Sequence, residues 1–344
     1  MLSRSFLITI LLMNAIELSP AQNQRIRSIA DLVREAGSNL RPLREDTGTY
    51  GSDQRASVID LYEAQLDLAQ EPGWILEEVF REEIVLADGE HVALPCNCLR
   101  TRRKGTALWI LTGIHGEEPA GPNALVESLP ALLELEGGGI PLVVFPLLNP
   151  LGYQLNWRYP NAATYSKSAP GSSVGDSDHL LPDEKGNARS RTPACRQAGL
   201  LTAKVLELAR EYPPLLTLDL HEDNMLQKGY VYSQGTRGAD DPPAKSIVEL
   251  FRLHAFPILM DGMTRFDEPV KGGIVSNVKD GSIDELLSAP TVILDGKPAK
   301  GPAAPSVLVL ETSSMNTGLE DRKQVHSTVL SSLKTLWEAA QTRK

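Results

Sequence analysis

Residues 108–118, LWILTGIHGEE, constrain the fold and the chemistry of this chain more than any other segment. Four consecutive apolar residues precede Gly113, which is typical of a buried strand that ends in a loop. His115 and Glu118 follow in that loop, and imidazole and carboxylate are ligand types that zinc accepts in proteins. The segment therefore predicts two metal ligands at the end of a buried strand.

Apolar segments alternate with helical patterns after this point, which favours an α/β fold with a mainly parallel, mixed central sheet flanked by helices. Further strands are expected at residues 142–148, 215–220, 229–233 and 307–310. Helices are expected from Pro119 with a restart at Pro130, and over residues 194–208, 243–253 and 325–337. Before them, partial alternation around Asp88-Gly89 predicts a hairpin with strands at 82–86 and 91–94.

Two more side chains of the right chemistry stand where predicted strands end. His221 follows the strand at 215–220, and Glu311 follows the strand at 307–310. The carboxyl ends of neighbouring strands border the ligand crevice of an open α/β sheet. We therefore expect His221 to be the third metal ligand. A carboxylate is unfavourable to bury without a function, so Glu311 is predicted to be the general base toward a metal-activated water.

The strand at 142–148 is followed by a turn that contains Asn149, Pro150 and Gly152. Arg158, slightly further on, can return toward the metal and stabilise an oxyanion on the substrate. Asp219 shares a strand face with His221 by the period-two rule. It either orients that histidine or forms a local salt bridge, and the sequence leaves both interpretations open.

These elements, in this order, resemble the zinc carboxypeptidase (carboxypeptidase A-like) family, in the superfamily of succinylglutamate desuccinylases and aspartoacylases. The resemblance covers roughly residues 105–340. His115-x-x-Glu118 looks like the family's first two ligands and His221 like the third. The turn followed by Arg158 is similar to the family's carbonyl-polarising arginine, and Glu311 matches its catalytic glutamate. The resemblance implies one Zn²⁺ ion and hydrolysis of an amide bond in a peptide or an N-acyl amino acid.

One family feature is missing. A segment of the DLNRNF type usually supplies an asparagine and an arginine for the substrate's carboxylate, whereas residues 173–181 here read SVGDSDHLL. A nearby arginine can replace that anchor, because guanidinium grips carboxylate with two hydrogen bonds. The candidates are Arg189, Arg191 and Arg196. Asp176 and Asp178 can instead favour an amine on the substrate, and each of these charges is also compatible with a solvated loop.

Three interpretations of function follow. The first is a metallocarboxypeptidase-type exopeptidase that uses zinc-activated water with Glu311 as base. The second is an N-acyl amino acid deacylase with the same metal centre, which the missing anchor permits. The third is a non-catalytic zinc-binding protein that recognises peptides, although such a protein needs neither a base nor an oxyanion donor.

Composition limits the kinds of partner and of environment that suit this chain. A net charge of −10 and a pI of about 5.2 argue against a nucleic-acid partner. The three cysteines do not make a disulfide framework. No stretch after the amino terminus is long and apolar enough to span a membrane. The oligomeric state is left open.

The amino terminus has two interpretations. Residues 1–21 resemble a secretory signal, with Arg4 before an apolar run and small residues near position 20. Alternatively Met13 is the true start and the protein is intracellular, so the compartment stays open. We expect residues 22–80 to be an amino-terminal extension or cap, and residues 81–344 to be the catalytic domain.

Overall fold

The computed structural model describes residues 53–342 except 86–90, 167 and 169–170. In this part of the chain, a mixed sheet runs in the order β1-β2-β4-β3-β5-β12-β6-β9-β8-β7. Its strands are β1 (Trp74–Val85), β2 (His91–Thr101), β3 (Ala107–Thr112), β4 (Leu142–Phe145), β5 (Pro214–Asp223), β6 (Tyr230–Ser233), β7 (Asp261–Met263), β8 (Pro269–Lys271), β9 (Ile274–Ser276) and β12 (Ser306–Ser313). A separate hairpin pairs β10 (Thr291–Leu294) with β11 (Lys297–Lys300).

The centre of the sheet is parallel, and most of the outer pairings are antiparallel. Strands β4, β3, β5 and β12 are parallel neighbours. The antiparallel pairings join β1 to β2, β2 to β4, β12 to β6, β8 to β9 and β7 to β8. Every residue of β3 and β4 is buried, which explains their uninterrupted apolar sequences. The expected α/β fold with a mixed sheet is confirmed.

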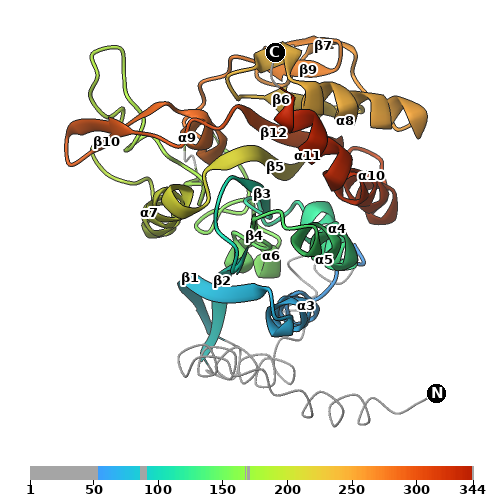
Figure 1. Ribbon diagram of the computed structural model, residues 1–344, viewed down its shortest axis with the longest axis horizontal. Coiled ribbons are helices and arrows are strands. Elements are labelled where there is room, and N and C mark those ends of the chain that lie inside the picture. The colour runs from blue at the N-terminus through green and yellow to red at the C-terminus, as the bar shows by residue number, and fades with distance from the viewer. Residues whose placement is uncertain (1–52, 86–90, 167, 169–170, 343–344) are drawn as a thin grey trace.

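Helices cover both faces of this sheet (Figure 1). In β3, Leu108 and Ile110 point into one core and Trp109 and Leu111 into the other, because successive side chains of a strand face opposite sides. The first core is shared with α3 (Val58–Gln70), α4 (Ala120–Glu127), α5 (Leu129–Gly137), α6 (Pro150–Leu155), α8 (Pro242–Leu253), α10 (Leu319–Ser331) and α11 (Leu333–Gln341). The second is shared with α7 (Arg196–Glu211) and α9 (Ile283–Ser288). A short 3₁₀ turn, η2 (Gly238–Asp240), precedes α8.

Several elements differ from the expected bounds for local reasons. The helix after Pro119 does restart, as α5, with Pro130 in its first turn. Strand β4 ends at Phe145 rather than at residue 148, since Pro146 has no N–H to donate. The expected terminal helix is two helices, α10 and α11, separated at Ser332. The Asp88-Gly89 turn of the expected hairpin lies outside the described residues.

The expected boundary between residues 80 and 81 falls inside β1. Strand β1 forms one edge of the main sheet, and Val58 and Leu61 of α3 are buried in the same core as β3. Residues 58–80 are thus continuous with the sheet and its core. The expected signal segment, residues 1–21, and the rest of the expected extension up to residue 52 lie outside the described part of the chain. Within the described part, the helices are all too short or too polar to cross a bilayer.

Candidate metal centre

The loop that follows β3 approaches the turn around α6 very closely. A Cβ atom on Gly116 would lie 1.9 Å from the carbonyl carbon of Gly152, so only glycine fits between the two ligand candidates of this loop. Asn149 orders the facing turn. Its Oδ1 accepts the Gly152 N–H at 2.9 Å, and its Nδ2 donates to the Arg158 carbonyl at 3.2 Å. The turn predicted from the sequence thus packs directly against the loop of residues 115–118.

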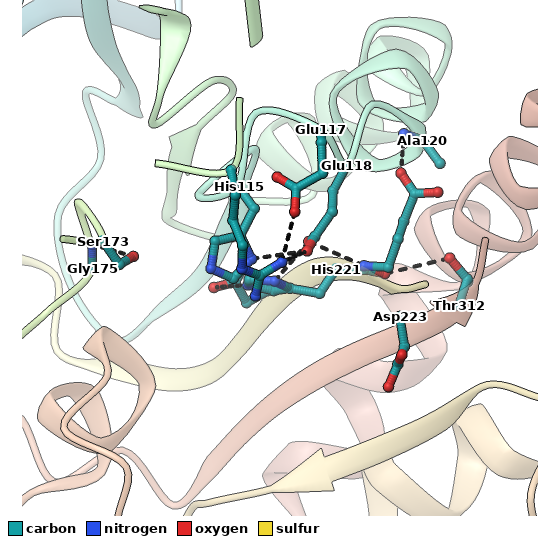
Figure 2. A network of polar contacts seen from close by, with 12 residues as sticks. His115, Glu117, Glu118, Ala120, Ser173, Gly175, His221, Asp223 and Thr312 are labelled. Atoms are coloured by element: carbon teal, nitrogen blue, oxygen red, sulfur yellow. Dashed lines mark hydrogen bonds and ion pairs between the residues drawn. The ribbon is translucent and has the colours of Figure 1, made fainter. Parts of the chain in front are cut away.

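Three metal-type side chains meet at the carboxyl ends of β3 and β5 (Figure 2). The Nδ1 atom of His115 lies 2.9 Å from Oε1 of Glu118, and Nδ1 of His221 lies 2.9 Å from Oε2 of the same carboxylate. One ligand atom from each of the three residues lies within 4.8 Å of the others. The backbone N–H of Glu222 also donates to Glu118 Oε2, at 3.1 Å. Two imidazoles therefore face one fixed carboxylate.

A second carboxylate lies behind His221. Asp219 Oδ2 is 3.2 Å from His221 Nε2, on the side of the ring opposite Glu118. Asp219 is completely buried, and among the described residues its carboxylate has no other donor. Of the two sequence interpretations, the geometry therefore agrees with the one in which Asp219 orients the histidine.

The ionisable side chains of this cluster shift one another's pKa values. Burial alone would raise the pKa of Glu118, but the adjacent His115 and His221 hold it well below its usual range. Burial would lower the pKa of His221, yet Asp219 and Glu118 raise it well above the ordinary value. For His115, burial and the charge of Arg158 lower the pKa to about 3. In the metal-free cluster the surroundings thus favour the charged forms of Glu118 and His221 and the neutral form of His115.

Arg158 lies directly beside this carboxylate. Its Nη1 atom is 2.8 Å from Glu118 Oε1 and 2.8 Å from Oε1 of Glu117. Glu117 was not singled out from the sequence, although it is the third residue of the HGEE motif. Burial, together with the charge of Glu118, raises the pKa of Glu117 to about 7. One guanidinium thus holds two adjacent carboxyl groups at the edge of the cluster.

Glu311 approaches the same cluster from β12. It is the register partner of His221 in the parallel pairing of β12 with β5. Burial, with the nearby Glu118 and Asp223 opposing the favourable charge of His221, raises its pKa to about 8. Within the described part of the chain its carboxyl group has no hydrogen bond or salt bridge, so it is free to exchange a proton.

These groups border one cleft of about 500 Å³. His115, Arg158, His221 and Glu311 line its wall, whereas Glu118 lies behind the two histidines and is 4% exposed. The arginines expected to replace the missing anchor do not line the cleft. Arg189 is paired with Glu285 on α9, and Arg196 is directed toward the carbonyl of Arg81 at 3.4 Å. Arg191 is exposed elsewhere in the loop.

The fold is similar to solved structures of metallopeptidase candidates. For the protein from Shewanella baltica, the identity is 20% and the TM-score 0.58, with 81% of this chain and 91% of that chain covered. For the protein from Shewanella amazonensis, the identity is 22% and the TM-score 0.57, with 80% of this chain and 92% of that chain covered. A metallo-carboxypeptidase from Burkholderia cenocepacia matches at 14% identity and a TM-score of 0.50, covering 83% of this chain and 70% of that one.

Neither a protein-family model nor a curated protein sequence matches the chain. At identities near 20%, the structural likeness establishes the fold alone. The expected resemblance to zinc carboxypeptidases is confirmed at this level: the chain has a carboxypeptidase-like fold.

Proposed function

We propose that the protein is a zinc-dependent hydrolase of amide bonds in which His115, Glu118 and His221 hold the ion. The convergence of their three ligand atoms within 4.8 Å carries this proposal. Two imidazole nitrogens and a carboxylate are the donor set of a catalytic zinc site that keeps one position open. The Asp219 carboxylate behind His221 fits the same assignment, since ligating histidines commonly donate their other N–H to a carboxylate.

Zinc in such a site supplies Lewis-acid chemistry, because it polarises a carbonyl oxygen and lowers the pKa of water. Glu311 is the proposed general base: it accepts a proton from the attacking water and donates it to the leaving amine nitrogen. The raised pKa of about 8 suits both halves of this transfer near neutral pH. Its lack of a hydrogen-bond partner among the described residues leaves both oxygens available.

Arg158 is the proposed stabiliser of negative charge on the substrate's carbonyl oxygen. It lines the cleft and lies beside Glu118, so its guanidinium is close to the reacting position. Nη1 is engaged by Glu117 and Glu118, whereas no hydrogen bond of Nη2 occurs among the described residues. A guanidinium at the cleft wall contributes to catalysis most when charge develops in the transition state.

The carboxypeptidase-like fold favours an exopeptidase acting on the carboxyl end of a peptide. The alternative is an N-acyl amino acid deacylase with the same centre. One observation favours it: residues 173–181 lack the asparagine–arginine pair, and Arg189 and Arg196 are engaged elsewhere. A protein that only binds zinc and recognises peptides is the interpretation with the least support. Such a protein would have no use for Glu311 or Arg158 in these positions.

One panel of substrates tests these alternatives. The full-length chain, loaded with one equivalent of Zn²⁺, is incubated with free and blocked peptides and with N-acyl amino acids, each with and without a chelator. We expect hydrolysis that the chelator abolishes and added Zn²⁺ restores. Activity on N-acyl amino acids alone would favour the deacylase. Binding of zinc and peptides without any product would contradict the hydrolase proposal.

A further inference from the structure

The segment of residues 53–57, directly before α3, packs against the proposed metal-binding loop. Nη1 of Arg55 donates to the carbonyl oxygen of Gly116 at 3.0 Å and to that of Tyr153 at 3.1 Å. Nη2 of the same side chain donates to Oδ1 of Asn156, the residue that ends α6, at 2.6 Å. Since Gly116 stands between two of the proposed ligands, one guanidinium joins their loop to α6.

The Arg55 guanidinium is buried and held from several sides. Its side chain is 1% exposed, and its Nε donates to Oδ2 of Asp53 at 2.7 Å. The guanidinium carbon lies 4.9 Å from the centre of the Tyr153 ring. All three nitrogens therefore have an acceptor, which offsets the unfavourable burial of the charge. Because the guanidinium is planar and rigid, it fixes the positions of these acceptors relative to one another.

The next residue connects the same segment to α4, the helix that follows the loop. The Ala56 N–H donates to Oδ1 of Asn123 at 2.7 Å, and the Ala56 carbonyl accepts the Tyr153 hydroxyl at 2.8 Å. Nδ2 of Asn123 donates in turn to the Tyr153 hydroxyl at 2.7 Å. Residues 55 and 56 thus hold the helix that follows the loop and the helix that faces it.

The backbone of the loop is otherwise held by long hydrogen bonds. The Gly116 N–H donates to the Arg158 carbonyl at 3.4 Å, and the Glu118 N–H donates to the His115 carbonyl at 3.3 Å. The bond from Arg55 to the Gly116 carbonyl is shorter and comes from a charged donor, and such bonds are the stronger kind. Arg55 is therefore the stronger constraint on the Gly116 peptide.

We propose that Arg55 is a positioning residue of the proposed metal centre. By holding the Gly116 carbonyl, its guanidinium keeps His115 and Glu118 in the arrangement that binds the ion. It acts through the loop backbone and lies outside the donor set itself. The proposal rests on the proposed function, because it takes these side chains as ligands. A loop that leaves this arrangement part of the time binds metal less tightly, since only the competent fraction binds.

Zinc affinity gives the first test, by competition with a chromogenic chelator. Arg55→Lys keeps the charge but loses the planar fork, so it cannot reach every acceptor, and Arg55→Met keeps only the apolar stem. We expect the zinc dissociation constant to rise by about tenfold or more in Arg55→Lys, as for other outer partners of a metal site. It should rise further in Arg55→Met. If Arg55→Met does not fold, Arg55→Lys carries the test.

The matched control is Arg100→Lys. Arg100 is a largely buried arginine that pairs with Glu77 and donates to the hydroxyl of Tyr212 at 3.0 Å. Tyr212 stands just before β5, so this cluster lies at the opposite end of that strand from His221. Arg100→Lys should lose stability but keep its zinc dissociation constant within about twofold of the wild type. A wild-type constant in Arg55→Lys, or the same weakening in both variants, would overturn the proposal.

Amide hydrogen exchange of the metal-free chain separates this proposal from the proposed function. If the wild type binds no zinc, the hydrolase assignment fails, and exchange at residues 113–118 still tests Arg55. We expect these amides to exchange about tenfold faster in Arg55→Lys than in the wild type and to be unchanged in Arg100→Lys, because the opening is local. Unchanged exchange of the loop in Arg55→Lys, or an equal increase throughout the chain, would refute the positioning role.

Discussion

His221 and Glu311 are paired in register on two adjacent parallel strands, β5 and β12. Paired residues of neighbouring strands project from the same face of a sheet, so the third proposed ligand and the proposed base face one cleft. His115 reaches that cleft from the loop after β3, the neighbour of β5 on its other side, and Glu118 of the same loop lies behind the two histidines. The backbone of three adjacent strands therefore determines where the proposed ligands and base lie.

Removal of either histidine should abolish stoichiometric zinc binding. We expect His115→Ala and His221→Ala to retain well under 0.1 equivalent of zinc after dialysis (roughly a tenfold loss or more), because two ligands remain. Elemental analysis of the purified chains measures this. His254→Ala is the control, since His254 is exposed on the far end of α8 and stacks on Phe256. One full equivalent of zinc in either variant would exclude the proposed ligand set.

Asp219→Asn should weaken zinc binding without abolishing it. The substitution keeps the size of the side chain but removes the negative charge behind His221, 3.2 Å from Nε2. Outer partners of this kind typically contribute about 10- to 100-fold in metal affinity. Competition with a chromogenic chelator measures the dissociation constant. An unchanged constant would show that Asp219 does not support the ligand.

Gly116→Ala should destabilise the protein and disturb the metal ligands on both sides of it. The new Cβ atom would clash with the backbone at Gly152, which cannot move as a side chain would. We expect a loss of about 2 kcal/mol or more in unfolding free energy, measured by urea denaturation. Gly137→Ala, at the end of α5 with nothing within 4 Å of the added atom, should be neutral or stabilising. Equal effects of the two substitutions would contradict the close packing described here.

The stability of the metal-free chain should depend on Glu311 in a pH-dependent way. Its pKa is raised from an ordinary 4.5 to about 8 in the folded state, so between these pH values the folded chain binds more protons than the unfolded chain. Stability should therefore fall as pH rises from about 4.5 to 8, at up to about 1.4 kcal/mol per pH unit. Glu311→Gln stays neutral and should escape this loss.

Thermal unfolding of the two metal-free chains tests this expectation. The melting temperature of Glu311→Gln should exceed that of the wild type at pH 8, and the two should converge near pH 4.5. A constant difference across this range would mean that the pKa of Glu311 is not raised by the fold.

Much of the fold could be predicted because its central strands carry strong local signals. Residues 108–111 and 307–310 are apolar runs that end at polar residues, and the rule that strand ends meet predicted the neighbourhood of His115, His221 and Glu311. The roles of these residues stay predictions. Strand β4 was expected to reach residue 148 because the apolar run continues to that point. It ends before Pro146, since residues can stay buried beyond the last one that pairs with a neighbouring strand.

The elements that were missed depend on partners that are remote in sequence. The expected strand at 82–86 covers only the end of β1, whose earlier part carries charges such as Glu77. Glu77 has the pattern of a solvent-exposed residue, but Arg100 of β2 pairs with it. Glu117 was missed because its partner, Arg158, comes from a different loop.

The most direct measurement is the turnover of Glu311→Gln at full zinc occupancy. The account predicts one equivalent of zinc per chain, as in the wild type, with kcat lower by about 10²–10⁴-fold on the best amide substrate, because the proton transfer has lost its base. Glu63→Gln, an exposed carboxylate on α3, should match the wild type in both respects. Wild-type turnover in zinc-loaded Glu311→Gln would contradict the central claim.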